Sequence, residues 1–125
     1  MTKRELRDYH HLQKQIRLLD GEIDEWRSRA EYSTRAPDRR AVVGDDTDPY
    51  PYIMDKITEC ERVRAAKIKK LNDINTALEL LDERESLIMR AHYCAGLTWE
   101  QISDIVGYST AQIHRIHNAA LSKMM

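Results

Sequence analysis

Two glycines, each followed two residues later by a hydroxyl side chain, divide the last third of the chain into three short segments. Gly96 precedes Thr98, and Gly107 precedes Ser109. Glycine supplies the left-handed turn at which helices commonly end, and Thr or Ser is favoured at the start of the next helix. The pattern therefore predicts that residues 82–125 form three short helices joined by tight turns.

Within each segment the apolar residues recur at the intervals of one helix face. The residues expected to face inward are Leu87, Ile88, Ala91 and Cys94 in the first helix, Ile102, Ile105 and Val106 in the second, and Ile113, Ile116, Ala120 and Leu121 in the third. A helix, a short turn with glycine and a second helix laid across a partner make a helix-turn-helix. We therefore expect an all-α protein with a helix-turn-helix at residues 82–125.

The run GLTWEQISDIVGYSTAQIHRIHNAALSKM carries a family resemblance. It resembles the C-terminal helix-turn-helix of bacterial sigma factors, the region that reads the upstream promoter element. It is closer still to the sigma-like regulators of the ArpU and RinA type, which are encoded by phages of Gram-positive bacteria. The matching features are TWEQI, the G-Y-S that opens the third helix, and I-x-R-I-H-x-x-A-L-x-K. The resemblance implies a phage late-gene activator that acts at a promoter with host RNA polymerase.

The third helix has an outward face suited to reading bases. With the apolar set inward, its outward residues are Thr110, Ala111, Gln112, His114, Arg115 and Asn118. Gln and Asn can pair with adenine through two hydrogen bonds, Arg can pair with guanine, and Ala can contact a thymine methyl group. Thr98 and Ser109 are expected to present hydroxyls and helix N-terminal amides to phosphates. These eight residues form the predicted double-stranded DNA site. Sigma-type recognition helices usually begin with charged residues, so the first turn departs from the family pattern.

The charge of the expected helix-turn-helix is low for a DNA-binding domain. Residues 82–125 hold four basic and five acidic side chains, and the whole chain has a formal net charge of −1. Because non-specific affinity for DNA comes from neutralising phosphates, one such domain should bind weakly. A homodimer or higher homo-oligomer, or recruitment beside RNA polymerase, would compensate. The alternative is an interaction protein that binds RNA polymerase or a sigma factor without reading DNA.

Residues 1–35 show the alternating three- and four-residue spacing of a coiled coil. The apolar positions are Tyr9, Leu12, Ile16, Leu19, Ile23, Trp26 and Ala30. This helix is expected to pack either on a second long helix of the same chain or on its own copy. Leu12, Ile16, Leu19, Ile23 and Trp26 are the predicted oligomerisation residues.

The first 81 residues are expected to form a helical hairpin or coiled-coil domain ahead of the domain at 82–125. All three prolines fall within a linker at about 33–51, and a second apolar helical stripe follows at 52–81. Asp82, with Glu85 three residues later, has the spacing of a capping box. Because no Gly or Pro interrupts residues 52–95, one helix or two remain open at this point.

No set of residues predicts an enzyme, a cofactor or a metal. His114 and His117 are three residues apart, but no carboxylate or thiolate stands beside them. The acidic group Asp45, Asp46 and Asp48 lacks the glycine and distant glutamate of a calcium loop. No apolar run approaches the length of a membrane span, and two cysteines without a signal peptide favour the cytoplasm, here that of a bacterial host.

Overall fold

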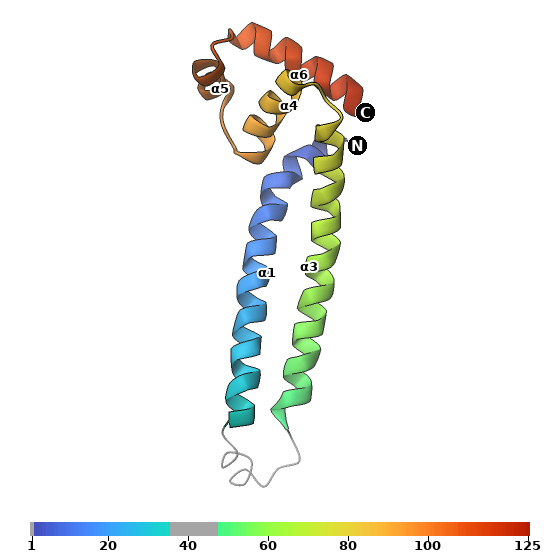
Figure 1. Cartoon of the computed structure of the whole chain (residues 1–125), viewed down its shortest axis with the longest axis vertical. Coiled ribbons are helices and arrows are strands. Elements are labelled where there is room, and N and C mark those ends of the chain that lie inside the picture. Colours follow the sequence, from blue (N-terminus) through green and yellow to red (C-terminus); the bar gives the residue numbers. More distant parts are fainter. Residues whose placement is uncertain (1, 36–47) are drawn as a thin grey trace. The chain divides into compact units, whose positions relative to one another are not determined.

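The computed structural model describes residues 2–35 and 48–125, which are almost entirely helical (Figure 1). The helices are α1 (Lys3–Arg35), α3 (Pro49–Glu79), α4 (Glu83–Met89), the five-residue π-helix η1 (Arg90–Cys94), α5 (Trp99–Val106) and α6 (Thr110–Met124). No strand occurs in these two ranges, so the predicted all-α class is confirmed. None of the described helices is long and apolar enough to cross a membrane.

Contacts divide the chain into two compact units, and both long helices contribute to each. One unit is Gln15–Ile68, and the other joins Met1–Lys14 to Lys69–Met125. The boundary falls inside the long helices because Leu6 and Tyr9 near the start of α1 share a core with the helices that follow residue 82. The division into these two units does not test the predicted domains, 1–81 and 82–125, which stay a prediction.

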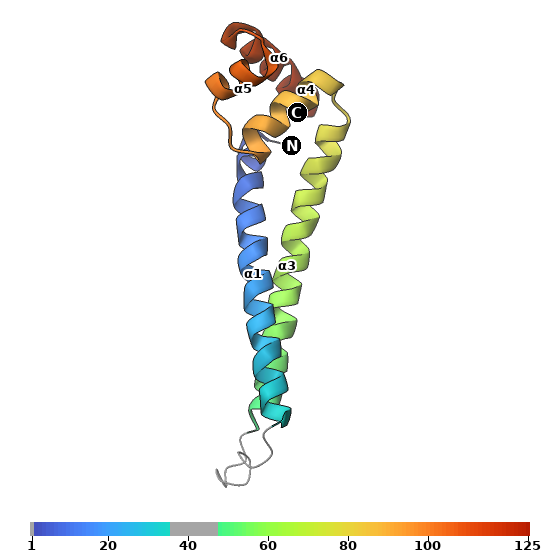
Figure 2. The same ribbon diagram turned by 60° about the vertical axis from the view of Figure 1, so that its left-hand side comes forward.

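In the unit Gln15–Ile68, α1 and α3 run antiparallel in both views of the ribbon (Figures 1 and 2). Its buried apolar residues are Ile23, Ile53, Ile57 and Cys60. Polar pairs flank this seam: Arg64 with Asp20, Arg27 with Glu61, and the Nζ of Lys67 donating to Oε1 of Gln15. Of the two partners that the heptad pattern allowed, a helix of the same chain is the one seen here.

The described helices extend into the range that was expected to be a linker, 33–51. Helix α1 continues to Arg35, and α3 begins at Pro49. Proline is tolerated in the first turn of a helix because the missing N–H would have no partner there. Residues 36–47, including the acidic residues Asp45 and Asp46, lie outside the described residues.

Helix α3 ends at Glu79, so residues 52–95 form more than one helix. Asp82 starts α4 as its N-cap. Its Oδ1 accepts from the N–H of Glu85 at 2.8 Å, and its own N–H donates to Oε1 of Glu85 at 3.3 Å. The predicted capping box is therefore present. The hydrogen bond from the Glu85 amide holds the pKa of Asp82 below its usual value.

The other unit has two apolar clusters, which place the helix-turn-helix on the ends of the long helices. The helix-turn-helix core consists of Ile88, Ile102 and Ile113, with Ile116, Tyr108 and Trp99 packed beside them. A second cluster fixes that core to the long helices: Leu6, Tyr9, Leu12, Ile74, Leu78, Leu81, Met89, Tyr93 and Ala120. The predicted heptad pattern began at Tyr9 and did not include Leu6, which is fully buried.

Candidate nucleic-acid interface

The turn between α5 and α6 is set by Gly107. Its φ of +77° lies in the left-handed region, and its N–H donates to the carbonyl of Ser103 at 2.9 Å. A Cβ added at Gly107 would meet no atom within 4 Å, so the backbone conformation alone favours glycine here. The Ser103 hydroxyl donates to the carbonyl of Tyr108 and closes the same turn. Gly96 also has a positive φ, +74°. Both predicted glycine turns are confirmed.

The N-terminal caps of α5 and α6 use the predicted hydroxyl residues. Thr98 Oγ1 accepts from the N–H of Gln101 at 3.2 Å, and Ser109 Oγ accepts from the N–H of Gln112 at 3.2 Å. In return, Oε1 of Gln112 accepts from the N–H of Ser109 at 3.1 Å. The oxygen of Gln112 is thus part of a cap, which leaves its NH₂ group as the part that can donate to a base.

The outward face of α6 is placed as the sequence predicted. Exposed positions are Thr110, Ala111, Gln112, His114, Arg115 and Asn118, while Ile113 and Ala120 are buried. The Nε of Arg115 donates to the carbonyl of Ala111 at 3.4 Å, which lays the side chain back along the helix surface. Six polar or small side chains therefore share one solvent-facing side of a helix whose other side is anchored.

Trp99 packs inside the domain. Its ring stacks on His92, with centroids 3.7 Å apart and planes 14° from parallel. The Nδ1 of His92 lies 2.8 Å from the carbonyl oxygen of Leu97, so the imidazole donates there and ties η1 to the turn before α5. His114 and His117 of α6 lie beside the same indole, with centroids 5.2 and 4.8 Å away. Trp99 therefore fills the junction between η1, α5 and α6.

His117 is buried in the interface between η1 and α6. Its Nε2 lies 2.6 Å from the hydroxyl of Tyr93. Burial, with further contributions from the charges of Lys3 and His92, lowers the pKa of His117 to about 4. The imidazole is therefore neutral at pH 7, and its tautomer decides which of the two groups donates in the hydrogen bond with Tyr93.

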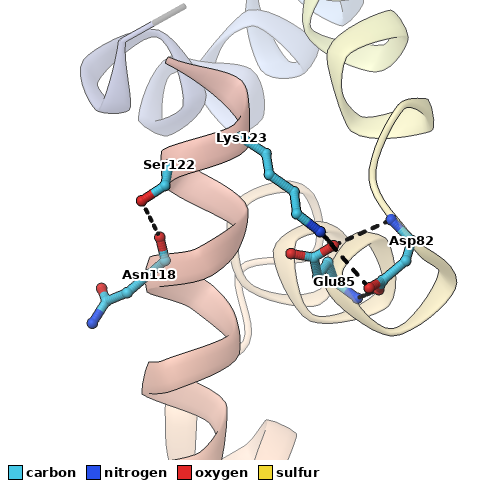
Figure 3. A network of polar contacts seen from close by, with 5 residues as sticks. All are labelled: Asp82, Glu85, Asn118, Ser122 and Lys123. Atoms are coloured by element: carbon cyan, nitrogen blue, oxygen red, sulfur yellow. Dashed lines mark hydrogen bonds and ion pairs between the residues drawn. The ribbon is translucent and has the colours of Figure 1, made fainter.

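Lys123 joins the C-terminal turn of α6 to the start of α4 (Figure 3). Its Nζ lies 2.6 Å from Oε1 of Glu85 and 4.0 Å from Oδ2 of Asp82. Glu85 is buried, with 3% of its surface exposed, and the hydrogen bond that it accepts raises the pKa of Lys123. The sequence identified Glu85 as a cap residue, but not as the buried partner of Lys123.

Arg90 also points into the protein. Its guanidinium donates to Oδ1 of Asn75 at 3.1 Å and to Oγ of Ser86 at 3.3 Å. The hydroxyl of Tyr9 donates to the same Asn75 oxygen at 3.0 Å. Arg90 and Lys123 thus pair with Asn75 and Glu85, whereas Arg84 and Arg115 are exposed on the surface.

An apolar groove of about 450 Å³ lies between α4 and η1 on one side and α5 on the other. It is lined by Leu87, Arg90, Ala91, Cys94, Ala95, Leu97, Ile102, Ile105 and Val106. The prediction that Leu87 and Ile105 face inward is wrong, because they are 54% and 71% exposed. The buried positions of α4 centre on Ile88 and Met89, and Ile102 alone is buried in α5, so the neighbouring side chains border the groove.

Among the described residues, no group of three or more His, Cys, Asp or Glu side chains could hold a metal ion. Cys60 and Cys94 are both free thiols. Burial raises the pKa of each thiol, which disfavours the reactive thiolate.

Comparison with known proteins agrees with this geometry. Residues 77–124 match the family Sigma-70, region 4. The RNA polymerase sigma-G factor of Bacillus subtilis is 29% identical over 83 residues, which cover 66% of this chain and 31% of the relative. The sigma-G factor of Clostridium acetobutylicum is 30% identical over 83 residues, which cover 66% and 32%. The chain thus spans about a third of the length of these relatives, and no solved structure matches. Residues 77–124 are therefore similar to sigma-70 region 4, and within them α5, the turn at Gly107 and α6 form a helix-turn-helix.

Proposed function

We propose that this protein is a sequence-specific DNA-binding transcriptional regulator in which α6 reads base edges in the major groove. The observation that carries the proposal is the exposed face of α6. This helix is capped by Ser109 and follows the glycine turn of a helix-turn-helix that matches sigma-70 region 4. Arg115 can pair with guanine and Asn118 with adenine, while Ala111 can contact a thymine methyl group. Thr110 and His114 complete the face, and the N-terminal amides capped by Thr98 and Ser109 are placed at helix starts that favour phosphate.

The finer proposal is a phage late-gene activator of the ArpU and RinA type, which acts at a promoter with host RNA polymerase in the bacterial cytoplasm. It rests on the resemblance of TWEQI, G-Y-S and the run from Ile113 to Lys123. The names of the relatives, RNA polymerase sigma-G factors, support action on transcription initiation.

A homodimer or higher homo-oligomer belongs to the same proposal. Of the expected oligomerisation residues, Leu12 and Ile23 are buried within the single chain, whereas Ile16, Leu19 and Trp26 are half-buried. A second copy would therefore pack on the partly exposed edges of the helical pair. Light scattering on the purified protein tests this, because a monomer at micromolar concentration would contradict it.

Binding-site selection from random DNA duplexes tests the reading of DNA directly. Wild-type protein should enrich one sequence, and Arg115→Ala and Asn118→Ala should each weaken binding to it by about 5- to 150-fold, the range expected for loss of a bidentate contact. Arg62→Ala is the matched control, because Arg62 lies in the other compact unit and pairs with Glu59 on the surface. Equal effects of Arg62→Ala and Arg115→Ala would contradict a reading role for α6.

The apolar groove favours a second candidate function, binding of RNA polymerase or a sigma factor without reading DNA. Leu87 and Ile105 expose apolar surface at its rim, which is typical of protein-binding sites. Capture of RNA polymerase by the tagged protein after nuclease treatment would support this candidate, provided that Ile105→Ser abolishes the capture and Arg115→Ala does not. Capture that is lost on nuclease treatment would instead favour DNA.

A further inference from the structure

The first four turns of α1 carry a basic stripe on the side away from the core. The stripe consists of Lys3, Arg4, Arg7, His10, His11 and Lys14, all of them exposed. With 3.6 residues per turn, these positions fall within an arc of about 120° around the helix. The acidic residues of the same turns, Glu5 and Asp8, fall outside this arc, and Glu5 is engaged in a cap with Thr2. The Lys and Arg side chains of the stripe therefore share one side of the helix.

This stripe belongs to the same compact unit as the helix-turn-helix. Leu6 and Tyr9, between the basic residues, are buried in one cluster with Tyr93 and Ala120. In both ribbon views the first turns of α1 lie near the C-terminal half of α6 (Figures 1 and 2). The electrostatics agree, since the charge of Lys3 helps to lower the pKa of His117 on α6. The charge of Arg7 likewise acts to lower the pKa of Tyr93, although burial outweighs it.

The stripe supplies charge that the helix-turn-helix lacks. Residues 82–125 carry one more acidic than basic side chain. Two of the four cations there, Arg90 and Lys123, make internal hydrogen bonds. By contrast, residues 2–14 hold four Lys and Arg side chains against two acids. A DNA-binding surface built only from residues after 82 would gain little from phosphate neutralisation.

We propose that Lys3, Arg4 and Arg7 bind DNA phosphates beside the bases read by α6, so that the start of α1 is part of the DNA-binding surface. This inference rests on the proposed function. Phosphate contacts fix the position of a protein on the duplex without reading sequence. The stripe would therefore provide affinity and register, while α6 provides specificity.

The test measures how the affinity of the full chain depends on salt. Fluorescence anisotropy with a short duplex of random sequence, over a series of KCl concentrations, gives the slope of log K against log salt. The triple variant K3Q/R4Q/R7Q should lower the magnitude of this slope by about 2 to 3, since each phosphate contact contributes about 0.9. The conservative variant K3R/R4K/R7K should keep the wild-type slope.

The matched control removes the same charge from the other compact unit. R17Q/R27Q/K56Q replaces three exposed cations within Gln15–Ile68 and should leave the slope near the wild-type value. Equal slopes for the two triple variants would overturn the proposal, because general electrostatics would then explain the effect. A wild-type slope in K3Q/R4Q/R7Q would also overturn the proposal, because the three side chains would then make no phosphate contacts. If the wild-type chain bound no duplex at all, the proposed function itself would fail.

Discussion

The Nζ of Lys123 lies 2.6 Å from the carboxylate of Glu85, which is 3% exposed, so one ion pair connects the last turn of α6 to the first turn of α4. Removing one partner of an ion pair lowers stability strongly when the remaining charge is buried, but only slightly when it is exposed. Lys123→Met should therefore lower the melting temperature by several degrees, because Glu85 would stay buried without its cation. Thermal unfolding followed by circular dichroism measures this.

The matched control for that pair is Lys69→Met. Lys69 forms an ion pair with Asp73, but both side chains are largely exposed. The melting temperature of this variant should stay close to that of the wild type. A similar decrease in both variants would show that burial of Glu85 does not determine the effect.

The helix-turn-helix core should be far more sensitive to truncation than the groove that borders it. Ile113 is fully buried, and Ile113→Ala should lower the free energy of unfolding by about 2–5 kcal/mol, since it leaves a cavity among packed side chains. Ile105 is 71% exposed, so Ile105→Ala should lower the free energy of unfolding by less than about 0.5 kcal/mol. Urea denaturation of both variants measures the difference. Equal losses would mean that Ile105 is buried in solution.

The sequence predicted the elements whose signals are local, but not the contacts between elements. The caps at Thr98 and Ser109 and the left-handed glycines depend on residues within one turn of each other, so their spacing identifies them. The Lys123–Glu85 pair joins residues 38 positions apart, which no local pattern reveals. The exposure of Ile105 was missed for a related reason. Helical spacing identifies an apolar face, but it does not show how much of that face a neighbouring helix covers.

The π-helix η1 is a further element that the spacing missed. The N–H of Ala95 donates to the carbonyl of Arg90, five residues earlier, at 3.0 Å. Such a wide turn shifts the following residues away from the 3.6-residue period that was used to predict the apolar face. It also accompanies the burial of Tyr93, the partner of His117 that the sequence reading did not select.

Two glycines should respond in opposite directions to the same substitution. Gly107→Ala should destabilise the protein by about 1–2 kcal/mol, because alanine is strained at a φ of +77°. Gly21 lies inside α1 with free space around its Cα. Gly21→Ala should therefore stabilise by about 1 kcal/mol through higher helix propensity. Chemical denaturation of the two variants checks the signs, and a stabilising Gly107→Ala would contradict the left-handed turn.

Stability should fall in mild acid because His117 is held neutral in the folded protein. Its pKa is about 4 in the folded state, against an ordinary value of 6.5 for an exposed histidine. Between these two values the unfolded chain binds the proton and the folded chain does not, so acid favours unfolding. The full contribution is present above pH 6.5 and is lost as the pH falls toward 4, to a total of about 3 kcal/mol.

The cause of this dependence can be assigned to one side chain by comparison with His117→Gln. Glutamine keeps a polar group beside the Tyr93 hydroxyl but does not titrate, so the variant should lose the part of the pH dependence between 6.5 and 4 that belongs to His117. Lys3, His92 and His114 also face this imidazole, and NMR titration of the individual histidine rings separates them. A His117 ring that titrates near 6.5 in the folded protein would contradict the buried, neutral state of this side chain.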